Sequence, residues 1–215
     1  MNQEQITQNK NTFIDYCKQY INREGIDNLL KYLETTDFFT APSSVSFHLN
    51  EEGGLCRHSL NVFETALKLY DSILSPAIDS NISPFTEKPS LESVAISTLF
   101  HDLCKTKLYH KVEKWKKDEN NKWISYPGWE INDEFPFGHG DKSCVIINWF
   151  MRLKQDELLA IRWHMGMFDT GEPGSSSRYA MQAAMGKSPL VTLVQVSDLL
   201  SANCMEKTTN WKDTI

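Results

Sequence analysis

The sequence predicts an all-α fold, a helical bundle into which one β-hairpin is inserted. Apolar residues recur at helical spacing on both sides of the middle of the chain, as in the repeat Leu60, Phe63, Leu67 and Tyr70. Between residues 108 and 129 the pattern changes toward the alternation that is typical of strands. A helical periodicity that is interrupted once favours a helical domain over a fold built on a central sheet.

Two helices and a loop are predicted before residue 55. Ile6, Phe13 and Cys17 share one face of an amphipathic first helix. A second helix is expected over Ile26–Leu33. The segment Phe39–Gly54 contains a proline, three serines and two adjacent glycines, and this composition predicts a loop.

Two further helices and a connection are predicted in the middle of the chain. One helix begins near His58 and carries the apolar repeat described above. The segment Ser75–Ser90 contains three prolines and predicts a surface connection. The run Leu91–Leu103 is apolar and predicts a buried helix, with His101 and Asp102 in its last turn.

The hairpin and four more helices complete the predicted fold. Asp118–Asn121 has the composition of a turn, and strand-forming residues lie on both sides of it. We expect this hairpin to project from the helical body. The helices that follow are predicted over Gly140–Leu153, Gln155–His164, Ser177–Met185 and Pro189–Cys204. Pro189 is then in the first turn of its helix, where proline is common.

Composition and charge exclude several classes of protein. The chain has 215 residues, enough for one domain with a sizeable core. Its formal net charge of −6 disfavours a binder of duplex DNA. No membrane segment and no signal peptide are expected, and the five scattered cysteines do not form a disulfide or zinc-binding pattern. We therefore expect a cytoplasmic protein.

Histidines and aspartates in apolar surroundings are the candidate functional residues. Four of the six histidines lie at predicted helix ends or among apolar helix residues: His58, His101, His139 and His164. Asp102 and Asp198 lie in equally apolar runs, where an ionised carboxylate needs a cation or several hydrogen-bond donors. Imidazole nitrogens and carboxylate oxygens together suit Mn²⁺, Fe²⁺, Co²⁺ or Zn²⁺ better than Ca²⁺.

The order of these residues is more specific than any one of them. A lone histidine on an apolar helix is more often a core residue than a ligand, and a lone buried aspartate is often a helix cap. The joint order His, His-Asp, His, His, Asp across separate helices predicts a metal centre.

This order resembles the metal motif of the HD-domain superfamily of metal-dependent phosphohydrolases. The resemblance rests on Leu55–Leu60 (LCRHSL), Leu99–Lys105 (LFHDLCK) and Asp198, and it extends over about residues 42–203. The segment Phe47–Leu55 resembles bacterial HD-type 3′-to-5′ exoribonucleases in particular. A Gly-Tyr-Pro triplet typical of HD-GYP cyclic-dinucleotide phosphodiesterases is absent, so that activity is not expected.

The resemblance implies a two-metal site. His58, His101, Asp102 and Asp198 would hold one divalent transition metal ion (Mn, Fe, Co, Ni or Zn). His139 and His164 would hold a second ion, with Asp102 bridging the two. The implied reaction is cleavage of a phosphomonoester or phosphodiester, in a nucleotide or short oligonucleotide, by a metal-activated bridging hydroxide.

The resemblance also suggests residues that contact this small phosphate-containing substrate. Asp102 and Lys105 would be catalytic, with the Lys105 ammonium on the phosphate. Lys142, Arg162 and His48 are further candidates for substrate binding. Solvated surface charges remain the alternative for Lys142 and Arg162, and a hydrogen bond within the loop remains the alternative for His48.

The predicted organisation has three parts, and two other functions remain open. N-terminal helices (residues 1–40) pack on an HD hydrolase domain (residues 41–207, with the hairpin at 108–129), and a tail follows at residues 208–215. The same ligand order also occurs in HD-fold di-iron oxygenases. A catalytically silent nucleotide-binding sensor is the second alternative.

Overall fold

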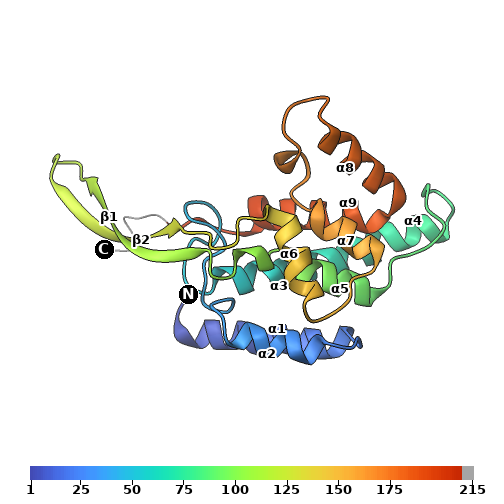
Figure 1. The fold of residues 1–215 in the computed structure, drawn as a ribbon, viewed down its shortest axis with the longest axis horizontal. Coiled ribbons are helices and arrows are strands. Elements are labelled where there is room, and N and C mark those ends of the chain that lie inside the picture. The colour runs from blue at the N-terminus through green and yellow to red at the C-terminus, as the bar shows by residue number, and fades with distance from the viewer. Residues whose placement is uncertain (210–215) are drawn as a thin grey trace.

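The predicted all-α fold with one inserted hairpin is confirmed by a computed structural model, which describes residues 1–209. A body of packed helices carries a two-stranded antiparallel hairpin that extends away from it (Figure 1). The strands are β1 (Tyr109–Lys117) and β2 (Trp123–Ile131), and the register pairs Tyr109 with Ile131 at the base and Lys117 with Trp123 near the tip.

The helices surround one hydrophobic core. In chain order they are α1 (Gln3–Tyr20), α2 (Ile26–Glu34), α3 (Gly54–Leu69), α4 (Ser75–Asp79), α5 (Leu91–Leu99), α6 (His139–Asn148), α7 (Gln155–Arg162), α8 (Ser176–Lys187) and α9 (Pro189–Leu200). The centre of the body is formed by α3, α5, α7 and α9, which pack on one another. In Figure 1, α1 and α2 cover one side of this group and α8 lies on the opposite side.

The N-terminal helices contribute to the same core. Phe13 of α1 is fully buried, and its ring meets the edges or faces of Phe38, Phe39 and Phe100 at centroid distances of 5.0, 5.8 and 5.6 Å. Such edge-to-face contacts add to the stabilisation from burial alone. The division of the chain at residues 40 and 207 stays a prediction.

The connection predicted over Ser75–Ser90 is shorter than expected. After α3 the chain continues through a π-helical turn, Tyr70–Leu74, into α4, so the prediction was wrong for residues 75–79. Pro76 lies in the first turn of α4. Proline is tolerated there because the first amide groups of a helix have no intrahelical acceptor.

His101 and Asp102 lie beyond the end of α5 and not in its last turn. The helix ends at Leu99, and residues Leu103–Lys105 form a separate 3-10 turn. The His101 Nδ1 atom is 2.7 Å from the carbonyl oxygen of Thr98. In a continuing helix this oxygen would accept from the amide of residue 102, so the imidazole takes the place of the backbone donor.

Several other helix ends differ from the predictions by a few residues. α6 and α7 end earlier than expected, and α9 is followed by a π-helical turn, Ser201–Met205. Of the predicted tail, Thr208 and Thr209 are described, and residues 210–215 lie outside the described part of the chain. Within residues 1–209, no helix is long and apolar enough to cross a membrane.

Candidate metal centre and its cavity

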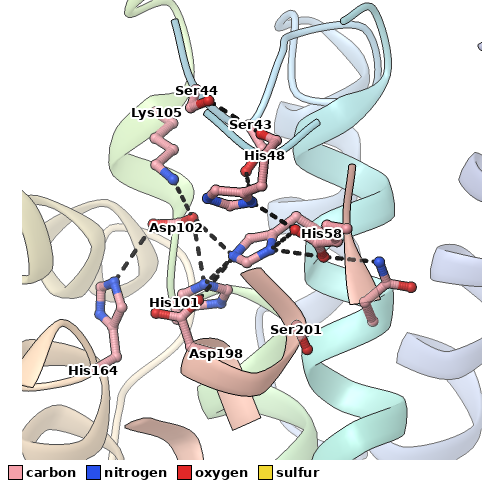
Figure 2. Close-up of polar contacts among 12 residues, drawn as sticks. Ser43, Ser44, His48, His58, His101, Asp102, Lys105, His164, Asp198 and Ser201 are labelled. Carbon is pink, nitrogen blue, oxygen red and sulfur yellow. Dashed lines mark hydrogen bonds and ion pairs between the residues drawn. The ribbon is translucent and has the colours of Figure 1, made fainter. Parts of the chain in front are cut away.

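The six predicted metal ligands meet in one cluster in the interior. Figure 2 shows His58, His101, Asp102, His164 and Asp198 of this cluster. They come from α3 (His58), the turn after α5 (His101 and Asp102), the first residue of α6 (His139), the turn after α7 (His164) and α9 (Asp198). Tertiary packing therefore unites residues that are far apart in the sequence. His58, His101 and Asp198 form one group of close donor atoms, and His101, Asp102 and His164 form a second.

Asp102 lies at the centre of the cluster. Its Oδ1 atom is 2.9 Å from His139 Nε2 and 3.5 Å from His164 Nε2. Its Oδ2 atom is 2.7 Å from Lys105 Nζ and 3.4 Å from His101 Nε2. The two oxygens of one buried carboxylate thus face different partners.

His58 connects the centre to α9. Its Nε2 atom is 3.1 Å from Asp198 Oδ1, 3.2 Å from His101 Nε2 and 3.5 Å from Asp102 Oδ2. Two imidazole nitrogens and two carboxylate oxygens therefore converge on one small volume. A cation that accepts several nitrogen and oxygen donors fits this arrangement.

The orientation of two imidazole rings also fits metal binding. His101 Nδ1 donates to Thr98 O at 2.7 Å, and His164 Nδ1 donates to Ile161 O at 2.6 Å. Each ring then presents Nε2 to the cluster with its lone pair available. His164 Nε2 is buried and has no hydrogen-bond partner among the described residues. Metal-bound histidines usually have this second-nitrogen hydrogen bond to a carbonyl or carboxylate.

Glu206 is a member of the cluster that sequence reasoning missed. Its carboxylate is almost fully buried and accepts from His48 Nδ1 at 2.6 Å, His58 Nδ1 at 3.0 Å and Asn61 Nδ2 at 2.8 Å. It follows the π-helical turn after α9, in a stretch without apolar periodicity. The sequence around Glu206 therefore carried no signal that distinguishes it from a surface glutamate.

Cys104 is buried beside the cluster. Its Sγ atom is 3.3 Å from His139 Nδ1. Burial raises the pKa of this thiol to about 12, with Asp102 adding to the effect. Cys104 is therefore a neutral thiol that packs against the ring of His139.

Two glycines allow the close approaches that assemble the cluster. A Cβ atom on Gly54 would lie 2.0 Å from the carbonyl oxygen of Leu49, so only glycine lets the preceding loop pack on the start of α3. A Cβ atom on Gly140 would lie 2.4 Å from the carbonyl oxygen of Arg162. This second contact brings His139 at the start of α6 beside His164.

The electrostatics of the cluster favour bound cations. Burial alone would raise the pKa of Asp102, but Lys105 and the surrounding imidazoles hold it well below its usual range. Burial would also raise the pKa values of Asp198 and Glu206. Both pKa values are lowered instead, at Asp198 by a hydrogen bond with His58 and at Glu206 by hydrogen bonds with His48 and His58. Despite its own burial, His58 has its pKa raised to about 10 by these two carboxylates. The centre thus concentrates carboxylate charge that divalent ions would neutralise.

Four members of the cluster, Asp102, His139, His164 and Asp198, form the floor of a cavity of about 740 Å³. Ser43, Ser44 and His48 line one wall, all from the loop ahead of α3. Phe47 and Phe168 also line the cavity and are 74% and 84% exposed, so they lie toward its mouth. A cavity with a polar floor and an aromatic mouth of this size can hold a small molecule that has a charged end and a flat apolar end.

Only two of the four predicted substrate-binding residues line this cavity. Lys105 and His48 do so. Lys142 forms an ion pair with Asp133, and Arg162 forms ion pairs with Asp141 and Asp169. The structure therefore offers no support for phosphate binding by Lys142 or Arg162.

A protein-family model, described as the HD domain, matches residues 55–203, a range that includes all six clustered ligand candidates. The chain belongs to the HD-domain family. Members of this family are typically metal-dependent phosphohydrolases, and the buried cluster of this HD domain is consistent with divalent metal binding. Neither a curated protein nor a solved structure matches the chain.

Proposed function

We propose that this HD-domain protein hydrolyses a phosphomonoester or phosphodiester bond in a nucleotide or short oligonucleotide. The observation that carries the proposal is the position of Asp102. It lies on the floor of the cavity with one oxygen toward His139 and His164 and the other toward Lys105. One carboxylate can therefore contact two ions and also orient a cationic side chain toward a phosphate.

The donor atoms divide into two sets. His58, His101, Asp102 and Asp198 would hold a first divalent ion, and His139 and His164 would hold a second, with Asp102 common to both. The mixture of imidazole nitrogen and carboxylate oxygen suits Mn, Fe, Co, Ni or Zn. When bound, such ions supply a water of lowered pKa and neutralise charge on the phosphate oxygens.

Lys105 is proposed to bind the phosphate. Its side chain is nearly buried, lines the cavity and lies 2.7 Å from Asp102. Burial would lower the pKa of this ammonium, but Asp102 raises it, so Lys105 stays charged. A fixed positive charge at the cavity floor stabilises the negative charge that develops on the phosphate oxygens.

His48 is proposed to contact the leaving group. Its Nδ1 atom is held by Glu206 at 2.6 Å, which orients the ring at the cavity wall. From this wall the remaining nitrogen, Nε2, can donate a proton to the leaving oxygen. General acids positioned in this way typically contribute about 10²–10⁴ in rate.

The loop ahead of α3 supports a nucleotide-like substrate. This loop carries the resemblance to HD-type exoribonucleases, and it supplies Ser43, Ser44, Phe47 and His48 to the cavity. We propose that the reactive phosphate lies on the floor while a base lies at the aromatic mouth. A position in the exoribonuclease-like group is part of this proposal.

The test is a hydrolysis screen over nucleotides, cyclic nucleotides and short oligonucleotides, with Mn²⁺, Mg²⁺, Co²⁺ and Fe²⁺ each supplied separately. We expect product release with at least one transition ion and its loss in His164→Gln. His110→Gln is the matched control, because His110 is exposed on the hairpin. Substrate-dependent oxygen uptake by an iron-loaded protein without hydrolysis would instead support an oxygenase. Nucleotide binding without turnover would support a sensor.

A further inference from the structure

The hairpin exposes aromatic side chains that neither the core nor the cavity uses. Trp115 and Trp123 are each 60% exposed. Side chains alternate between the two faces of a strand, and directly paired residues share a face. The register pairs Lys111 with Trp129 and Lys117 with Trp123. One face of the hairpin therefore carries Lys111, Glu113, Trp115, Lys117, Trp123 and Trp129, and we call it the tryptophan face.

The tryptophan face begins at the cavity. Tyr109, the first residue of β1, lines the cavity beside Lys105 and lies on the same face as Lys111 and Trp115. From Tyr109 the strand runs away from the helical body (Figure 1). At about 3.3 Å per residue, Tyr109 and Lys117 are separated by roughly 26 Å along the strand. A linear ligand that starts in the cavity can thus follow this face outward.

The charge of this region is opposite to that of the whole chain. Residues 105–122 contain seven lysines and three acidic residues, whereas the chain has a net charge of −6. Lysines stand beside aromatic rings on the tryptophan face, with Lys111 5.7 Å from the Trp129 centroid and Lys117 5.5 Å from the Trp123 centroid. Ammonium groups that lie beside flat rings match a chain of phosphates and bases.

We infer that the tryptophan face binds a single-stranded oligonucleotide, whose phosphate end enters the cavity. Bases of a single strand are free to stack on Trp115 and Trp123, whereas those of a duplex are not. The placement of the end rests on the proposed phosphohydrolase function, but binding along the hairpin does not.

The charge of this face supports an oligonucleotide over a second copy of the chain. The tryptophan face carries Lys111 and Lys117 against Glu113, so a symmetric contact would join two surfaces of the same net charge, and these repel each other. Lys111 is already paired with Glu52, but both side chains are about half exposed or more, at 60% and 49%. Exposed ion pairs are weak, so a phosphate can replace this carboxylate at little cost.

The first test measures binding by fluorescence anisotropy with a labelled single strand of about 12 nucleotides. Trp115→Ala and Trp123→Ala are each expected to weaken binding by about 5- to 150-fold, the range for loss of one stacked base. Trp149→Ala is the matched control, because Trp149 is 58% exposed on the helical body. It should bind as the wild type does.

The second test uses salt. Lys117→Gln should reduce the slope of log affinity against log salt concentration by about 0.7, the value for one phosphate contact on a single strand. Lys31→Gln, on the exposed side of α2, is the control and should leave the slope unchanged. Melting temperatures of all variants establish that each protein is folded.

Failure of this inference and failure of the proposed function give different results. If the wild type hydrolyses mononucleotides but the Trp115 and Trp123 variants bind the strand normally, the tryptophan face is not the binding surface. If the wild type binds the strand through these tryptophans but hydrolyses nothing, the inference stands and the proposed function is wrong. A dimer in sedimentation that Trp115→Ala dissociates would also overturn the inference, in favour of a contact between copies.

Discussion

Glu206 binds the nitrogen of His58 that faces away from the metal-site cluster. Both carboxylate oxygens lie 3.0 Å from His58 Nδ1, while His58 Nε2 lies 3.1 Å from Asp198 on the other side of the ring. A proton held on Nδ1 by Glu206 leaves the Nε2 lone pair directed at the cluster. Glu206 is therefore a positioning residue for the first proposed metal ion.

Replacement of Glu206 should weaken metal binding while leaving the fold intact. We expect Glu206→Gln to lower metal affinity by about 10- to 100-fold, as is typical for partners of metal-bound histidines. Competition against a chromogenic chelator measures this affinity. Glu172→Gln, at an exposed loop position, is the matched control. Unchanged affinity in Glu206→Gln would mean that Glu206 only satisfies buried hydrogen bonds.

Metal binding should release a proton from His58. Without metal, the pKa of His58 is raised to about 10, because Asp198 and Glu206 outweigh the effect of burial. A metal ion requires the neutral imidazole, so below about pH 10 binding must displace one proton. Near neutral pH we expect metal affinity to rise by about tenfold per pH unit. Calorimetry in two buffers that differ in ionisation enthalpy counts the protons released.

The raised pKa of His58 also makes the stability of the metal-free protein depend on pH. A raised pKa in the folded state means that protonated His58 stabilises the fold fully below its usual value of 6.5, and that this stabilisation is lost as the pH rises through about 10. Protein whose metal has been removed by a chelator should therefore have a lower melting temperature near pH 10 than near pH 6.5. His58→Gln should show a smaller change over the same range, and an equal change would assign the effect to other groups.

Most of the fold was predictable because the spacing of apolar residues along the chain indicates which side chains are buried. The repeat of Leu60, Phe63, Leu67 and Tyr70 indicated α3 because these side chains face one core. The ends of α5 and α7 were less predictable. At each end an imidazole two residues beyond the helix donates to a backbone carbonyl oxygen, Thr98 O or Ile161 O, and no periodic pattern encodes this contact.

The site was predictable only where side-chain chemistry conflicted with its surroundings. Asp102 and Asp198 were recognised because a carboxylate in an apolar run needs a cation or donors. Glu206 lies in a polar stretch and shows no such conflict, so its burial could not be inferred. Lys142 and Arg162 were named as candidates for phosphate binding because they are basic, but their carboxylate partners are set by tertiary packing, which the sequence does not show.

Loss of Phe13 should destabilise the whole domain and not α1 alone. Its ring is fully buried and contacts rings from residues 38, 39 and 100, so its removal leaves a cavity in the shared core. Phe13→Ala should lower the free energy of unfolding by about 3–5 kcal/mol. Urea unfolding followed by circular dichroism measures this free energy. Tyr179→Ala, at a position that is 65% exposed, should change it by less than about 0.5 kcal/mol.

The cooperativity of this unfolding tests the predicted division at residue 40. Since Phe13 belongs to the same core as α3 and α5, we expect a single transition in which both parts unfold together. Two separate transitions would show that residues 1–40 form an independent unit.

Asp102 and Lys105 should differ strongly in their importance for catalysis. Asp102 contacts His139 and Lys105 directly and lies near His101 and His164, so it is common to both proposed metal sets. Lys105 contributes one ammonium group toward the phosphate. Loss of one such transition-state contact is commonly about 2.7–4 kcal/mol, or about 10²–10³ in rate. Asp102→Ala should therefore reduce kcat/KM by more than Lys105→Ala does.

Metal content and folding decide how this comparison is interpreted. Asp102→Ala should contain less metal than the wild type, whereas Lys105→Ala should retain its metal and lose only rate. Both variants should keep a helical circular dichroism spectrum, because the apolar core around them is unchanged. Lys107→Gln is a suitable control, since Lys107 is exposed next to the same turn. If Asp102→Ala kept full metal content and near-native turnover, Asp102 would not be shared between two ions and the proposed mechanism would be wrong.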